Sequence, residues 1–218
     1  MDGTLVDSEK LWDVALVELA TRYGGVLSPA GRRAMVGTSM ADSMAILHAD
    51  LGQQWRDAAV GAAWLEARVA QLFVDGLRWR PGALALLRAV RAAAIPTALV
   101  TSTPRHLVEV ALDTLGRASF DVVVCGDEVT ATKPDPSPYL TAARLLAVPI
   151  NRCVAIEDSP TGISSALTAG AAVLAVPSAV PIDPVDGLHL LDSLADADLR
   201  LLAALLAPVT VPGGGAAV

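Results

Sequence analysis

The chain has 218 residues, a formal net charge of −7 and 53% hydrophobic residues. This length suits one hydrophobic core with a smaller insert, and the acidic charge disfavours binding to nucleic acid or to anionic membranes. The apolar residues form no uninterrupted run of about 18, which a membrane-spanning helix requires, and acidic residues near the start argue against a secretory leader. We expect a cytoplasmic protein, a monomer or weak dimer, whose partner is a small molecule.

The first part of the chain, residues 9–79, is predicted to be entirely helical. Three stretches carry apolar residues at the spacing of a helix, and Ser8 is a suitable N-cap for the first of them. These stretches are LWDVALVELATRY, SMADSMAILHADL and WRDAAVGAAWLEARVAQLFV. No sequence between them has the pattern of a strand, so we expect a purely helical unit.

From Pro81 onward, helical stretches alternate with short apolar strands. The predicted helices span residues 81–95, 104–116, 135–148, 159–170 and 191–207, and the predicted strands span residues 97–101, 120–126, 152–158 and 171–176. This alternation is typical of right-handed βαβ units. We predict an α/β fold, a doubly wound parallel sheet built from residues 1–8 and 80–218, with the helical unit of residues 9–79 inserted and residues 209–218 as a frayed tail.

Two residue types argue against other kinds of site. Cys125 and Cys153 lie in apolar strand-like segments, and we interpret them as buried free thiols of a protein in a reducing compartment. The three histidines are scattered along the chain, so the sequence does not favour a histidine-based metal site.

The candidate site lies where the predicted strands end, because open parallel sheets bind ligands at the carboxyl ends of their strands. The turn Asp2-Gly3-Thr4 is of a kind that normally follows a strand, although only Met1 precedes it. The residues expected at this edge are Asp2, Thr101, Ser102, Lys133, Glu157 and Asp158.

These side chains favour the chemistry of phosphoryl transfer. Carboxylates that lie close together repel one another unless a cation joins them, and oxygen ligands point to Mg²⁺. Hydroxyl groups and one ammonium group suit the oxygens of a phosphoryl group. Each stretch alone also has a structural interpretation as a tight turn, a helix cap or a stiff loop, and it is their shared position that favours a site.

Four stretches, DGTLVDSE, LVTSTPR, KPDPSPY and AIEDSPTGISSALTAG, resemble the four motifs of the haloacid dehalogenase superfamily. The helical insert resembles the cap domain of the branch that contains phosphoglycolate phosphatase and β-phosphoglucomutase. The resemblance extends from Asp2 to about residue 207. It implies a Mg²⁺-dependent enzyme that hydrolyses phosphate monoesters of small metabolites through an aspartyl-phosphate intermediate.

The resemblance also implies a role for each site residue. Thr101, the backbone N–H of Ser102, and Lys133 would bind the phosphate. Asp158 would bind Mg²⁺ directly, with Glu157 as a ligand or as a partner of the ligands and the backbone carbonyl of Asp2 as a further ligand. Asp7 and Ser8 match the hinge to the cap. Asp2 matches the general acid and base, which favours phosphate esters over halides because an alkoxide must be protonated as it leaves.

The nucleophile of the family's first motif, Asp-x-Asp-Gly-Thr, falls one position before Met1. We therefore expect that the reading frame begins upstream and that a central strand leads to this aspartate. A sheet formed from the present sequence should be interrupted at that place. The alternative is a catalytically silent protein that binds phosphorylated metabolites.

The substrate is set by the cap, where the stretch of residues 37–44 resembles a loop that reaches over the active site. The mutase branch has an arginine where Met40 stands, and a thioether cannot pair with a second phosphate. We therefore favour a phosphatase acting on a sugar phosphate or phosphoglycolate. Arg32 and Arg33 lie nearby and keep the hexose-phosphate mutase as an alternative, while Met40 also suits plain packing of the cap.

Overall fold

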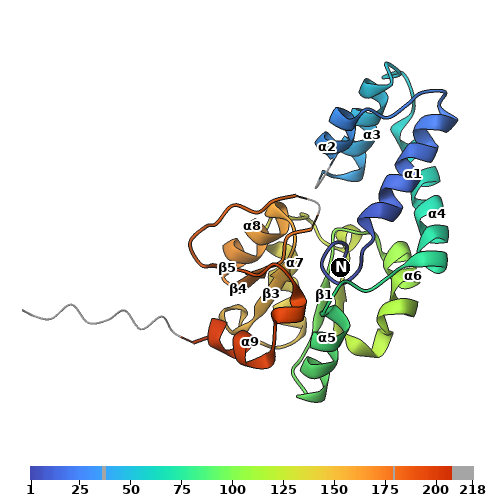
Figure 1. Ribbon diagram of the computed structural model, residues 1–218. Helices are drawn as coiled ribbons and strands as arrows, with labels where there is room; N and C mark the ends of the chain where they lie inside the picture. Colours follow the sequence, from blue (N-terminus) through green and yellow to red (C-terminus); the bar gives the residue numbers. More distant parts are fainter. Residues whose placement is uncertain (36–37, 179, 208–218) are drawn as a thin grey trace, which may run out of the picture.

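A computed structural model describes residues 1–35, 38–178 and 180–207 of the chain. Gly37, in the predicted cap loop, and the predicted tail of residues 209–218 lie outside the described residues. Figure 1 shows a group of helices joined to an α/β layer structure, with the N-terminus at the junction of the two. No helix in the described residues has the length and apolar composition needed to cross a membrane.

The segment that follows Ser8 is helical, as predicted. It forms α1 (Glu9–Arg22), α2 (Pro29–Met35), α3 (Met40–Asp50) and α4 (Ala58–Gly76). The side chains of Ser39 and Asp57 cap α3 and α4 by accepting hydrogen bonds from backbone N–H groups. Ser8, by contrast, does not cap α1 with its side chain, because its hydroxyl donates to Asp2 instead. The short helix α2 was not predicted as a separate element.

The remaining residues alternate between helices and strands. The elements are α5 (Ala83–Ala92), β1 (Ala98–Val100), α6 (Arg105–Leu115), β2 (Val122–Val124), α7 (Ser137–Leu145), β3 (Val154–Glu157), α8 (Pro160–Ala169), β4 (Ala172–Ala175), β5 (Leu188–Leu190) and α9 (Leu199–Leu205). The four predicted strands are confirmed as β1–β4. Gly116 and Gly170 occupy the C-caps of α6 and α8, where glycine commonly ends a helix.

The strands form two parallel sheets within the described residues. One pairs β1 with β2, and the other has the order β3-β4-β5. The N-terminal turn forms only isolated bridges, from Val6 to Asp2 and to Trp79. Within the described residues, the two sheets are not paired with one another.

Helices cover both faces of the second sheet, as a doubly wound fold requires. Along β4, Val173 and Ala175 belong to the cluster formed with α7 and α8, whereas Leu174 belongs to the cluster formed with α5 and α9. This alternation follows from the two-residue period of a strand.

A third hydrophobic cluster joins the helical insert to the α/β part. Leu19 of α1 and Phe73 of α4 belong to the same cluster as Leu107 and Leu112 of α6, and all four are fully buried or nearly so. The insert therefore shares apolar contacts with α6. The domain limits at residues 9 and 79 stay a prediction.

Four further features differ from the sequence predictions. The closing helix, predicted over residues 191–207, is the shorter α9, which begins at Leu199. Asp198 is its N-cap and accepts a hydrogen bond from the backbone N–H of Leu201. The helix predicted from Pro81 begins at Ala83, after Gly82 in a left-handed conformation. β5 was missed, since this three-residue strand has no long apolar run. Cys125 is fully buried, but Cys153 is only partly so, and both are free thiols.

Substitution of Gly82 tests how the start of α5 packs against the backbone at Leu194 and Ala195. Its φ is +80°, and a Cβ there would overlap the backbone of Leu194 and Ala195. We expect Gly82→Ala to lower the free energy of unfolding by more than about 2 kcal/mol, since backbone strain of about 1 kcal/mol or more adds to the overlap. Gly24→Ala is the matched control, because Gly24 has a φ of +73° with open space around it. Equal losses in urea denaturation of the two variants would contradict this packing.

Candidate active site

A buried ion pair lies at the centre of the candidate site. Lys133, on the loop between β2 and α7, contacts Glu157 at the end of β3, and the two side chains are 9% and 5% exposed. The Lys133 Nζ also donates to the carbonyl of Val100, 3.2 Å away, at the end of β1. The lysine therefore links the two sheets at their carboxyl edge.

The environment of Glu157 stabilises its ionised form. Burial raises the pKa of this carboxyl, but the charge and hydrogen bond of Lys133 outweigh burial and leave the pKa lowered. The Tyr139 hydroxyl also donates to Glu157, and burial together with the Glu157 charge holds the pKa of Tyr139 well above its usual value. A Cβ on Gly162, in the first turn of α8, would overlap the Glu157 carboxylate. Glycine is thus required for this helix to approach Glu157.

Asp158 lies against the N-terminal turn. The Thr4 Oγ1 donates to its Oδ1 at 2.8 Å. A Cβ on Gly3, whose φ is +63°, would overlap its carboxylate. Burial and the neighbouring charge of Glu157 raise the pKa of Asp158, against the hydrogen bond from Thr4. A second cation close to Asp158 would relieve this cost.

Asp2 connects three segments through its carboxylate. Its Oδ1 accepts from the Ser8 hydroxyl at 2.6 Å and from the Trp12 indole at 3.4 Å, while its Oδ2 accepts from the Thr103 hydroxyl at 2.7 Å. Ser8 precedes α1, Trp12 lies on α1, and Thr103 lies on the loop after β1. The orientation of Asp2 therefore depends on the position of α1.

The loop after β1 places the two predicted hydroxyl residues differently. Thr101 is buried, and its Oγ1 accepts from the backbone N–H of Thr103 at 3.2 Å. Ser102 is exposed. A Cβ on Gly126 would overlap the backbone of Ser102, so the loop after β2 packs closely against this loop.

The predicted site residues therefore lie at one edge, contributed by the N-terminal turn and by the loops after β1, β2 and β3. Thr4, Thr103 and Tyr139 were not predicted as site residues, and Ser8 was predicted only as a cap and as part of the hinge. Each of these four lies inside a stretch that carried the resemblance. Their positions were visible in the sequence, but their partners were not, because every one of these hydrogen bonds depends on the fold.

Asp158 is the acidic side chain that suits a hard cation, and the acidic residues do not form a preformed metal-binding cluster. Among the described residues, no three His, Cys, Asp or Glu side chains converge as a metal site. Asp2 is held by Ser8 and Thr103, and Glu157 is held by Lys133. Asp158 remains, and Mg²⁺ commonly binds one or two carboxylates and keeps several waters. An oxygen site at Asp158 therefore suits Mg²⁺.

Two of the three cap residues Arg32, Arg33 and Met40 are engaged by neighbouring groups. Arg32 forms ion pairs with two carboxylates of α1, those of Asp13 and, at 3.3 Å, of Glu9. Met40 packs against the hydrophobic cluster that joins the cap to α6, in agreement with the packing interpretation. Arg33 is exposed.

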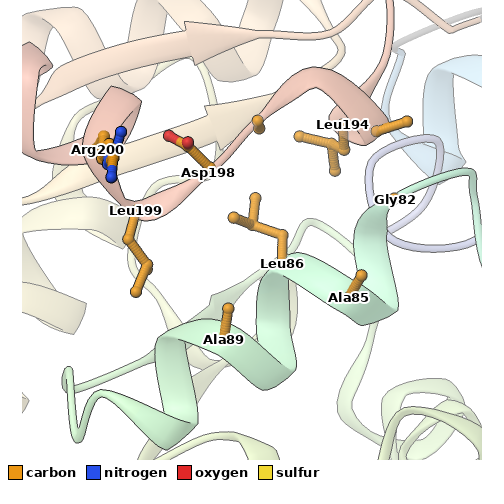
Figure 2. A pocket seen from close by; sticks show the side chains of 10 residues that line it. Gly82, Ala85, Leu86, Ala89, Leu194, Asp198, Leu199 and Arg200 are labelled. Carbon is orange, nitrogen blue, oxygen red and sulfur yellow. The ribbon is translucent and has the colours of Figure 1, made fainter.

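A groove of about 380 Å³ lies elsewhere, between α5 and the segment that leads into α9 (Figure 2). Apolar side chains such as Leu86, Leu194 and Leu199 line it, with Asp198 and Arg200 at one side. None of the candidate site residues lines this groove. It is therefore separate from the carboxyl edge of the sheets.

The buried ion pair makes a direct prediction about stability. Lys133→Met leaves the Glu157 charge without its partner, and we expect the free energy of unfolding to fall by about 3–5 kcal/mol. The double variant Lys133→Met/Glu157→Gln removes both charges and should recover much of this loss. The measurement is urea denaturation of the three proteins. A loss below about 1 kcal/mol in the single variant would show that Glu157 is not held by Lys133.

The chain resembles known proteins over most of its length. Residues 1–170 match the family model described as haloacid dehalogenase-like hydrolase. Hexitol phosphatase A of Escherichia coli (strain K12) is 34% identical over 176 residues, which cover 81% of this chain and 80% of that protein. Validoxylamine A 7'-phosphate phosphatase of Streptomyces hygroscopicus subsp. limoneus is 32% identical over 206 residues, which cover 92% and 90% of the two chains.

A solved structure confirms the fold. The HAD hydrolase, family IA, variant 3, of Entamoeba histolytica HM-1:IMSS superposes with a TM-score of 0.84 at 24% identity, covering 94% of this chain and 96% of that one. The family match spans more than half of the sequence and includes the edge that gathers Asp2, Lys133 and Asp158. The chain therefore belongs to the haloacid dehalogenase-like hydrolases, a family of enzymes.

Proposed function

We propose that this protein is a Mg²⁺-dependent phosphatase that hydrolyses the phosphate monoester of a small metabolite of the sugar-phosphate class. The observation that carries the proposal is the buried Lys133–Glu157 pair beside Asp158 at the edge where Asp2 and Thr101 also lie. The relatives described above, by name a hexitol phosphatase and a validoxylamine A 7'-phosphate phosphatase, support a small phosphorylated substrate.

The chain's own groups have distinct tasks in this proposal. The positive charge of the Lys133 ammonium offsets the negative charges of the phosphoryl oxygens and of the attacking carboxylate. The Thr101 hydroxyl and the Ser102 N–H orient those oxygens, and such preorganised donors account for much of the rate enhancement in phosphoryl transfer. Glu157 and Tyr139 position the ammonium. A bound Mg²⁺ at Asp158 would neutralise further phosphoryl charge.

The nucleophile is the aspartate that the family pattern places one position before Met1. Met1 is buried, and the residues that follow it contact Thr103 through Asp2 and Asp158 through Thr4, so a residue joined to Met1 would lie close to this edge. Its carboxylate would attack phosphorus in line while the ester P–O bond breaks. Water would then attack the aspartyl-phosphate, releasing inorganic phosphate and the free carboxylate.

Asp2 would supply and recover the proton. As an acid it protonates the leaving alkoxide, and as a base it takes a proton from the attacking water, so the cycle leaves it unchanged. In the present arrangement its carboxylate accepts from Ser8, Trp12 and Thr103. A movement of α1 would release two of these contacts, which ties the availability of Asp2 to the position of the cap.

The two alternatives differ in what they require. A hexose-phosphate mutase needs a cationic group in the cap loop for a second phosphate. At that loop Met40 packs in the hydrophobic cluster, and Arg32 pairs with α1, whereas Arg33 is exposed and has no carboxylate partner among the described residues. A silent binding protein needs no nucleophile. The phosphatase is favoured over the mutase by Met40, and the following experiment separates it from the silent protein.

The decisive test compares this chain with one extended by about ten residues upstream. We expect the codons before Met1 to encode apolar residues and then aspartate, and we expect the extended chain to hydrolyse an aryl phosphate. Chelation of divalent ions should abolish the activity and added Mg²⁺ should restore it. Replacing the upstream aspartate with asparagine should lower the turnover at least a thousandfold, about 4 kcal/mol of barrier. An extended chain that remains inactive with Mg²⁺ would refute the phosphatase.

Asp158 provides a test that does not depend on turnover. We expect Asp158→Asn to weaken Mg²⁺ binding at least tenfold, about 1.4 kcal/mol, because a neutral amide replaces a charged oxygen ligand. The measurement is a calorimetric Mg²⁺ titration of the extended chain. Asp113→Asn is the control, since Asp113 lies exposed on α6. Equal affinity in the Asp158 and Asp113 variants would show that the cation binds elsewhere.

A further inference from the structure

A second cavity, of about 660 Å³, adjoins the candidate active site. It is lined by the two segments that connect the cap to the α/β part, by α1 and α2, and by Ser178 after β4. The Ser178 Oγ lies only 3.1 Å from where a Cβ of Gly3 would be, and Gly3 packs against Asp158. Burial raises the pKa of Glu9 on the cavity wall, and the nearby charges of Asp2 and Asp158 raise it further. The cavity therefore lies next to the catalytic edge.

The acidic groups of this cavity are already paired. Five basic and three acidic side chains line it. Lys10 binds Asp7 at 2.6 Å, and Arg32 binds both Glu9 and Asp13. Of the basic residues in the part of the chain that the structure describes, Arg33, Arg78 and Arg80 line the cavity without a carboxylate partner. The cavity thus carries an excess of positive charge.

Arg80 is held in place by neutral groups. Its Nη1 donates to the Ser178 hydroxyl at 2.7 Å, and its Nη2 donates to the Pro177 carbonyl at 3.0 Å. Its backbone N–H donates to the carbonyl of Leu5 at 2.8 Å. These contacts fix the guanidinium but do not neutralise it. A cation oriented before binding is suited to an anionic group, because little rotational freedom is lost when the ligand arrives.

The catalytic edge has the opposite charge balance. Asp2, Glu157 and Asp158 lie there with Lys133 as their basic neighbour, so this edge favours the metal ion. The cavity, by contrast, favours an anion. A ligand that reaches from one to the other meets a metal-binding end and a basic end, and a substrate with anionic groups at both ends matches this polarity.

We propose that Arg33, Arg78 and Arg80 bind a second anionic group of the substrate, a carboxylate or a second phosphate. This inference rests on the proposed phosphatase function and specifies its substrate class: a phosphorylated sugar acid or a sugar bisphosphate. A neutral hexitol phosphate would leave the three guanidinium groups without a partner. The arginines act here on substrate selection, at a distance from the bond that breaks.

The test uses the extended chain with three substrates of equal carbon number: a hexitol phosphate, a hexonic acid phosphate and a hexose bisphosphate. We expect kcat/KM for at least one doubly anionic substrate to exceed that for the hexitol phosphate about tenfold or more. The comparison between carboxylate and second phosphate identifies the group that the cavity prefers. Equal or higher kcat/KM for the hexitol phosphate would overturn the inference and leave the phosphatase intact.

The exposed arginines provide the matched variants. Arg33→Gln and Arg78→Gln should each lower the preference for the doubly anionic substrate about tenfold, mainly through KM. Arg88→Gln is the control, because Arg88 lies exposed on α5 outside the cavity. Preferences that stay unchanged in both cavity variants would overturn the inference.

Binding separates this inference from the proposed function. Calorimetric titration of the chain with hexonic acid phosphate requires no turnover. If hydrolysis of every substrate fails but Arg33→Gln and Arg78→Gln weaken binding about tenfold, the phosphatase is wrong and the anion site stands. If the chain hydrolyses an aryl phosphate but binds hexonic acid phosphate no more tightly than hexitol phosphate, the anion site is wrong.

Discussion

The ion pair between Lys133 and Glu157 is the interaction on which the candidate site depends. Both side chains are almost completely buried, and burying charges is costly unless they are paired and hydrogen-bonded. The pair meets this condition through the Tyr139 hydroxyl and the Val100 carbonyl. Because these partners come from β1, α7 and β3, the pair fixes three segments of the chain relative to one another. The loops that carry Thr101 and Asp158 are adjacent to it.

Much of this arrangement could be predicted from the sequence because its signals are local. Short apolar runs predict β1–β4, and glycines at 116 and 170 predict where two helices end. The edge that collects Asp2, Lys133 and Asp158 follows from the rule that parallel strands present their carboxyl ends together. None of these steps requires knowledge of a contact between distant residues.

The parts that could not be predicted depend on competition between partners. Ser8 is a normal N-cap by type, but its hydroxyl instead binds Asp2, a stronger acceptor because it is charged. Asp198 divides the predicted closing helix because its side chain caps a new start. Arg32 was a candidate for a second phosphate, yet Glu9 and Asp13 already bind it. In each case the sequence identifies a donor or an acceptor, and the fold decides which partner it finds.

The hydrogen bonds of Asp2 connect this electrostatic centre to the cap. Two of its donors, Ser8 and Trp12, belong to the first connection and to α1, while the third, Thr103, belongs to the α/β part. The second connection, residues 77–82 between α4 and α5, carries Arg80, which donates a hydrogen bond to Ser178 beside Gly3. Both connections therefore end in contacts with the N-terminal turn or its neighbours. A shift of the helical insert would change both groups of contacts. On the proposed function, substrate binding in the cavity and proton transfer at Asp2 would therefore respond to the same movement.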